Sequence, residues 1–173
     1  MKGFQDPNNN MNINNKNSDF DVNKKLYIKA FNLQTKGDFV QAAKNYNILF
    51  KMHFRTEDFF LNYAIVSQYL NETSNAIVLL KEAIKINPKN FIPFFKMGFI
   101  LNNKGSFYEA YPFAKKAIEL EPNVWESHHN LIKILINLNR PKEAISFALT
   151  AKNLFSSNHL FSDLLGEIFK SIG

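Results

Sequence analysis

The sequence predicts an all-α fold, an α-α superhelix (solenoid) of four helical hairpins followed by a C-terminal capping helix. Three observations predict it: a phrase that returns after 34 residues, small residues at fixed places within that interval, and a glycine or asparagine near the middle of every copy. Only 6 Gly and 6 Pro occur in 173 residues, so turn signals are sparse and long helices are favoured. An apolar content of 46% is enough for a core in a chain of this length.

The repeat unit is 34 residues long. KEAIKINPKN at residues 81–90 returns as KKAIELEPNV at residues 115–124. The same offset aligns four consecutive blocks without a gap, residues 23–56, 57–90, 91–124 and 125–158. Position 20 of every block is alanine, and position 27 is Leu49, Ala83, Ala117 or Ala151. Since small side chains let two helices approach closely, these positions predict helix contacts.

Each block contains its own turn signal. Position 15 is a residue type that tolerates the left-handed conformation ending a helix: Gly37, Asn71, Gly105 and Asn139. Each block is therefore predicted to hold two helices. Pro88 and Pro122, at position 32 of the two middle blocks, predict the end of the second helix. Pro112 lies inside a predicted helix, so we expect that helix to begin near Phe107, which leaves the proline close to its start.

The two ends of the chain differ from the repeats. Residues 1–22 include the polar, low-complexity run NNNMNINNKN, and we expect a disordered, asparagine-rich tail there. Residues 159–173 place apolar side chains at helical spacing, opposite Asp163, Glu167 and Lys170, which predicts an amphipathic capping helix. Such a helix is either a solubilising cap or part of a longer repeat array.

Composition narrows the class of protein. The absence of cysteine excludes disulfides, thiolate metal sites and cysteine nucleophiles, and it fits a reducing compartment. The net charge of +6 comes from scattered lysines, so we expect a solvated surface and no nucleic-acid partner. No apolar run reaches the roughly 18 residues of a membrane span, and the first residues do not resemble a secretory signal. We therefore expect no membrane association and a cytoplasmic location.

The sequence carries no pattern typical of a catalytic site. His128 and His129 are adjacent, so on a helix their side chains point about 100° apart and cannot share a metal ion. A glycine-rich phosphate loop is also missing. We therefore expect a protein that is not an enzyme, with no catalytic residues, no cofactor and no metal.

The 34-residue period and the recurring alanine, glycine and proline positions resemble the tetratricopeptide repeat family. The resemblance covers roughly residues 23–173. It implies a non-catalytic adaptor or scaffold that binds a peptide segment of a partner protein in a concave groove, which is lined by the first helix of each repeat. In this family the groove uses chiefly positions 2, 5, 6, 9, 12 and 13. The peptide-binding candidates that the resemblance implies are Tyr27, Phe31, Leu61, Asn62, Ile65, Phe95, Lys96, Phe99, His129, Asn130 and Lys133.

The implied groove is mainly apolar. Positions 5 and 9 lie one helical turn apart and are apolar or aromatic in three blocks, whereas the fourth block has His129 and Lys133. An apolar segment with an acidic group near Lys96 or Lys133 would suit such a groove. We do not expect chaperone C-terminal tails as partners, because only Asn62 and Lys96 match the residue pattern that binds them.

Other uses of the apolar residues stay open. The asparagine-rich tail could cover the groove, two copies could join through it as a homodimer or a larger assembly, or the aromatic residues could belong to the core. The repeats could also be the regulatory region of a longer enzyme such as a glycosyltransferase.

Overall fold

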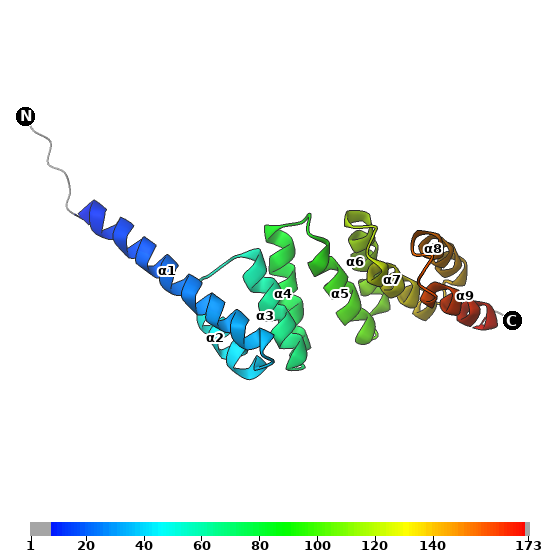
Figure 1. Ribbon diagram of the computed structural model, residues 1–173, viewed down its shortest axis with the longest axis horizontal. Helices are drawn as coiled ribbons and strands as arrows, with labels where there is room; N and C mark the ends of the chain where they lie inside the picture. Colours follow the sequence, from blue (N-terminus) through cyan, green and yellow to red (C-terminus); the bar gives the residue numbers. More distant parts are fainter. Residues whose placement is uncertain (1–7, 172–173) are drawn as a thin grey trace, which may run out of the picture. The chain divides into compact units, whose positions relative to one another are not determined.

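The computed structural model describes the backbone of residues 8–171 and the side chains of residues 21–170. Within residues 8–171 the chain forms nine α-helices joined by short turns, and no strand (Figure 1). The helices are α1 (Asn8–Thr35), α2 (Phe39–Lys51), α3 (Glu57–Tyr69), α4 (Thr73–Ile86), α5 (Phe91–Asn103), α6 (Phe107–Leu120), α7 (Trp125–Asn137), α8 (Pro141–Leu154) and α9 (Leu160–Ser171). The predicted all-α class is confirmed.

The helix boundaries follow the 34-residue period. α3, α5 and α7 begin at Glu57, Phe91 and Trp125, which is position 1 of their blocks. The four predicted turn residues all adopt positive φ: Gly37 (81°), Asn71 (60°), Gly105 (80°) and Asn139 (56°). After each of them, the next backbone N–H reaches back five residues, as in Ser106 N to Leu101 O at 2.9 Å. The repeated turn signal therefore ends the first helix of every hairpin.

Capping and proline placement fix the starts of several helices. The side chains of Asp38, Thr56 and Asn90 accept hydrogen bonds from backbone N–H groups in the first turn of α2, α3 and α5. Pro141 lies at the first turn of α8, where its missing N–H costs no helical hydrogen bond. α6 begins at Phe107, as predicted from Pro112, which the helix contains.

The chain divides into two compact units, one ending at Ala76 and the other beginning at Ile77. In the first unit, α1 packs on α2, and α2 on α3. Their interface is aromatic: the Tyr46 ring has no exposed surface and stacks on Tyr63 with 5.5 Å between ring centroids. The Tyr46 hydroxyl donates a 2.8 Å hydrogen bond to Gln34 Oε1, and burial raises the pKa of Tyr46 well above its usual range.

The second unit is held together by small residues. α5 packs on α6, α6 on α7, α7 on α8, and α8 on α9. The alanines of α6 and α8 have at most 1% of their surface exposed: Ala110, Ala114, Ala117, Ala144, Ala148 and Ala151. α9 covers the end of this unit by burying Phe161, Leu164, Leu165 and Ile168, whereas Phe169 remains 53% exposed. The period-based alanine positions therefore mark close helix contacts.

The first helix extends further than the sequence suggests. α1 begins at Asn8, so residues 8–22 are helical where composition predicts a disordered tail. Helix growth is cooperative, because each residue added to an existing helix gains a hydrogen bond without a new nucleus. Residues 1–7 lie outside the described residues, and for them disorder stays a prediction.

Replacing Ala110 by leucine should destabilise the protein by about 1–3 kcal/mol, because the contact between α5 and α6 has no space for added methyl groups. Tyr108→Ala, on the same helix at 85% exposure, is the control and should change stability by no more than about 0.5 kcal/mol. Urea unfolding followed by circular dichroism measures both. If Ala110→Leu unfolds at the wild-type urea concentration, the repeat register is wrong.

Candidate functional site

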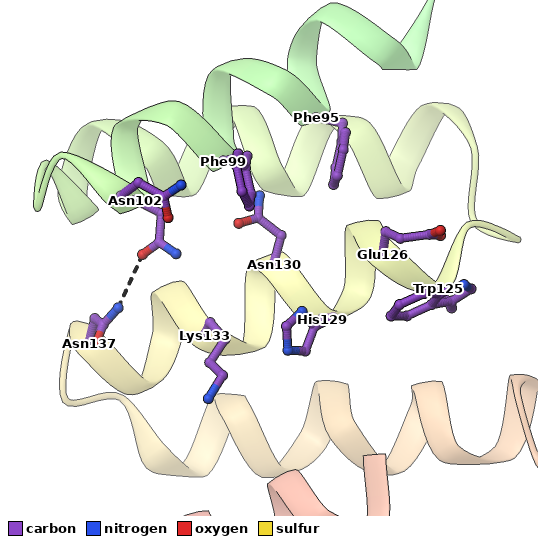
Figure 2. A pocket seen from close by; sticks show the side chains of 10 residues that line it. Phe95, Phe99, Asn102, Trp125, Glu126, His129, Asn130, Lys133 and Asn137 are labelled. Carbon is purple, nitrogen blue, oxygen red and sulfur yellow. Dashed lines mark hydrogen bonds between the residues drawn. The ribbon is translucent and has the colours of Figure 1, made fainter. Parts of the chain in front are cut away.

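A hollow of about 370 Å³ lies on the second unit, where the first helices of the third and fourth repeats, α5 and α7, face each other (Figure 2). We call it the α5–α7 cavity. α5 lines it with Phe95, Phe99, Asn102 and Asn103. α7 lines it with Trp125, Glu126, His129, Asn130, Lys133 and Asn137.

Aromatic side chains form two sides of the α5–α7 cavity. Phe95 and Phe99, one turn apart on α5, stack with 6.3 Å between their ring centroids. Trp125 and His129, one turn apart on α7, form a tilted pair with 6.4 Å between their ring centroids. Phe99 is 44% exposed and Trp125 is 38% exposed, so large apolar rings remain in contact with solvent at this place.

Side-chain amides form the remaining wall. Asn137 Nδ2 donates a 3.1 Å hydrogen bond to Asn102 Oδ1, which links α7 to α5 at one end of the cavity (Figure 2). Asn130 projects from α7 toward α5 and is only 4% exposed. Its Nδ2 is buried and has no hydrogen-bond partner among the described residues.

Gly98 makes room for the Asn130 amide. A Cβ atom at Gly98 would lie 3.1 Å from Asn130 Nδ2 and 3.1 Å from Ala114 Cβ. Any larger residue would therefore press on both the amide and the α5–α6 contact. The placement of Asn130 depends on the absence of a side chain on the facing helix.

The charges around the cavity are nearly balanced. Lys133 Nζ lies 3.3 Å from a carboxylate oxygen of Glu167 on α9, and Glu126 adds a second carboxylate at the opening. Burial lowers the pKa of His129, the nearby Lys133 ammonium lowers it further, and Glu167 opposes the change. His129 is therefore neutral at pH 7.

In the first unit, the candidate residues are hydrogen-bonded to one another or partly buried. Asn62 Nδ2 donates a 2.8 Å hydrogen bond to the Tyr27 hydroxyl, and Gln34 Nε2 reaches Asn62 Oδ1 at 3.4 Å. Leu61 is only 7% exposed and packs in the core, whereas Phe31 is 41% exposed. The polar candidates of this unit are thus satisfied within the chain.

A shallower hollow of about 310 Å³ runs along α1 in the first unit. Its lining combines Ile28, Asn32 and Leu33 with Lys25, Lys29 and Lys36. Flexible lysines on one exposed helix face are usually solvated. This hollow offers a weaker candidate site than the α5–α7 cavity.

The structure brings together five of the six candidates that lie in the second unit: Phe95, Phe99, His129, Asn130 and Lys133. Lys96 does not line the cavity; burial lowers the pKa of its ammonium. The candidate list lacked Trp125, although it lies one helical turn before His129 and could have been found from that spacing. It also lacked Glu126, Asn102, Asn103 and Asn137, all of them at groove positions of the repeat.

Among the described side chains, those of residues 21–170, no three histidine or carboxylate groups lie where they could hold a metal ion. Within residues 8–171, every helix is too short or too polar to cross a membrane.

Hairpins that follow one another at a constant interval define the chain as a helical-repeat protein. A family model described as "Tetratricopeptide repeat" matches residues 94–124, which fall within the third repeat. The match covers most of one of the four blocks, and the hairpins on either side of it keep the same 34-residue interval. No curated protein sequence matches the chain.

Solved structures share the fold. MamA from Desulfovibrio magneticus RS-1 matches with a TM-score of 0.77 and 15% identity, covering 84% of this chain and 83% of its own. MamA AMB-1 matches with a TM-score of 0.78 and 18% identity, covering 88% and 83%. PilF of Pseudomonas aeruginosa matches with a TM-score of 0.72 and 15% identity, covering 89% and 70%. At such identities the similarity establishes the solenoid fold alone.

The pKa of His129 should be measurably below the usual 6.5 when the imidazole is followed by NMR across a pH series. Because the folded state resists protonation, the unfolded state binds the proton first, and stability should fall as pH drops through 6.5 toward the folded-state pKa. Lys133→Met removes one cause and should raise the pKa of His129, whereas Glu167→Gln should lower it further. If neither variant moves the titration, these charges do not reach the imidazole.

Proposed function

We propose that the chain is a non-catalytic protein-interaction module, an adaptor or scaffold that binds a peptide segment of a partner protein on the first helices of its repeats. The α5–α7 cavity is the best-defined part of this surface. The observation that supports it most is the pair of partly exposed rings, Phe99 and Trp125, beside a buried amide without a partner.

Burial of these rings supplies the driving force in this proposal. Removing apolar surface from water contributes about 25 cal/mol per Å², so rings that are more than a third exposed can gain substantially from a partner. A hollow of about 370 Å³ lies in the range that holds a few side chains of a bound segment. Among the candidates of the first unit, Phe31 is 41% exposed and Ile65 is partly exposed, so they add apolar surface on the first helices of their own unit.

The cellular setting belongs to the same proposal. A chain without cysteine suits a reducing compartment, and we place the interaction in the cytoplasm. The partner is a protein rather than a nucleic acid, because the positive charge is scattered instead of gathered on one face.

Self-association is the second candidate function. Ile28 and Phe31 on α1 are 48% and 41% exposed, and Phe169 on α9 is 53% exposed, so apolar side chains are also available near both ends of the repeats. Light scattering over a concentration series separates the two candidates. A monomer at every concentration would exclude assembly through these residues.

The double variant Phe95→Glu/Phe99→Glu should lose the partner while it keeps its fold, because Phe99 is already 44% exposed and a charge there disturbs no core. The matched control is Phe169→Glu, which adds a carboxylate at a similarly exposed ring on α9. Proteins captured from a native cell extract by wild type, variant and control are compared by mass spectrometry, after circular dichroism shows equal helicity. Identical captured sets would place recognition away from this cavity.

A further inference from the structure

Positions 3, 7 and 10 of the first helix are buried in the later repeats. In the second repeat they are Phe59, Tyr63 and Val66, none of them more than 8% exposed. The rings of Phe59 and Tyr63 lie against the Tyr46 ring of α2, with 6.0 and 5.5 Å between centroids. These positions are therefore where a first helix packs on the second helix of the repeat before it. The fourth repeat buries the same positions of α7: Ser127, Leu131 and Ile134.

In α1 the same three positions are exposed and mostly cationic. They are Lys25, Lys29 and Asn32, and Lys36 follows at position 14. Together with Val22, these residues recur every three or four places, so they form one stripe along the helix, which we call the α1 basic stripe. The face that the second and fourth repeats use for stacking is thus open to solvent on α1.

Apolar surface accompanies the lysines of the α1 basic stripe. The hollow of about 310 Å³ follows the stripe, and Ile28 and Leu33 border the lysines within it. Val22 is 53% exposed and Ile28 is 48% exposed. A partner that covers the stripe therefore gains from burying apolar side chains as well as from pairing charges.

The charge of the α1 basic stripe has one sign. Asp21, 3.2 Å from Lys25, is the only carboxylate in residues 21–36, and this exposed pair contributes little. Among the described side chains, Lys29 and Lys36 have no ion-pair partner. α2, which packs on α1, contains no acidic residue. An acidic partner therefore complements the stripe.

The chain itself does not offer such a partner for the α1 basic stripe. Two copies that paired stripe to stripe would bring lysines together. Residues 1–7 span at most about 25 Å when extended, whereas Lys29 lies about 32 Å along the helix from Asn8. These seven residues cannot fold back as far as the middle of the stripe.

We propose that the α1 basic stripe binds an acidic amphipathic helix of a partner protein. The bound helix takes the place on α1 that the second helix of the preceding repeat takes on α3 and α7, with carboxylates at the lysines and an apolar side chain in the hollow. α1 has the length for such a contact, since it contains 28 residues where α3 and α7 contain 13. In Figure 1 the first half of α1 extends beyond α2.

This surface is a second one, beyond the proposed function. The α1 basic stripe shares no residue with the α5–α7 cavity. Its lysines occupy positions 3, 7 and 14, none of which is a groove position of the repeat. A chain with both surfaces can hold two proteins at once, as a scaffold does.

A protein helix suits the α1 basic stripe better than a membrane or a nucleic acid. Helices that lie on membranes carry their lysines at the borders of an apolar face, whereas here the lysines lie in the middle and Ile28 and Leu33 flank them. The stripe holds only three of the 21 basic residues of the chain, and a phosphate backbone offers nothing apolar to its hollow.

The test uses a phage-displayed library of helical peptides three heptads long, about 32 Å, with one face randomised. The library is selected on the purified full chain, and recovered peptides are synthesised and titrated by fluorescence anisotropy. We expect peptides with several Glu or Asp residues on the randomised face. Their affinity should fall about tenfold or more between 0.05 and 0.5 M salt, because the charges involved are partly exposed.

The triple variant Lys25→Glu/Lys29→Glu/Lys36→Glu should weaken these peptides about a hundredfold or more, because like charges then face each other. Peptides with lysine in place of their acidic residues should bind the triple variant and not the wild type. That exchange of specificity cannot result from unfolding. If circular dichroism shows lost helicity, Lys25→Gln/Lys29→Gln/Lys36→Gln replaces it, with a loss of about tenfold expected.

The matched control changes the net charge equally but on the second helices. Lys81→Glu/Lys115→Glu/Lys142→Glu alters three exposed lysines and should change affinity by less than about threefold at 0.15 M salt. Phe95→Glu/Phe99→Glu should bind the acidic peptides as the wild type does. If the latter variant loses them, they bind at the α5–α7 cavity, so the inference is wrong while the proposed function stands.

Other outcomes also overturn the inference. These are a folded chain that yields no peptide, recovered peptides that are not acidic, and equal binding by the triple variant. Vesicles of phosphatidylserine and phosphatidylcholine, and polyuridylate RNA, are tested in parallel. Binding of either one that depends on the three lysines, without binding of an acidic helix, would make the stripe a lipid or RNA surface. Association of the chain in light scattering that the triple variant abolishes would make the partner a second copy.

Discussion

The close approach of helices at small residues is the constraint on which the rest of the structure depends. Ala110 and Ala114 have at most 1% of their surface exposed, and a Cβ at Gly98 would come within 3.1 Å of Ala114. Helices packed this closely leave no room for large side chains at the contact. Phe95 and Phe99 therefore lie at the α5–α7 cavity, where the rings keep a solvent-accessible surface.

The features that sequence could predict are those decided by a single residue and its own backbone. A glycine or asparagine at position 15 predicts positive φ, and Gly37, Asn71, Gly105 and Asn139 all adopt it. The start of α6 at Phe107 follows from Pro112 for the same reason, since a proline tolerates only the first turns of a helix. The 34-residue period and the backbone preferences of glycine, asparagine and proline are therefore enough to predict the helical hairpins, without information on long-range contacts.

The features that sequence could not predict depend on several residues at once. Asn62 and Asn130 look equivalent in the repeat, yet a hydroxyl on Tyr27 and a methylene in Gln34 decide that one is paired and the other is not. Leu61 was predicted to face the groove and is buried, because its exposure is set by neighbouring helices rather than by its position in the repeat. Residues 8–22 were predicted to be disordered from their composition, yet they are helical. Composition does not show that these residues continue a helix whose later turns are packed against α2.

Stability alone does not account for the α5–α7 cavity. A buried amide without a partner costs about 1–3 kcal/mol, and a single oxygen on Phe95, as in Tyr27, would give Asn130 the partner that Asn62 has. A tyrosine at position 95 would keep its ring stacked on Phe99, so this substitution would change the packing little. The first unit has the hydroxyl, on Tyr27, whereas the second unit has Phe95 at the corresponding position. An unsatisfied amide beside partly exposed rings is therefore a cost in free energy that packing within the second unit leaves in place.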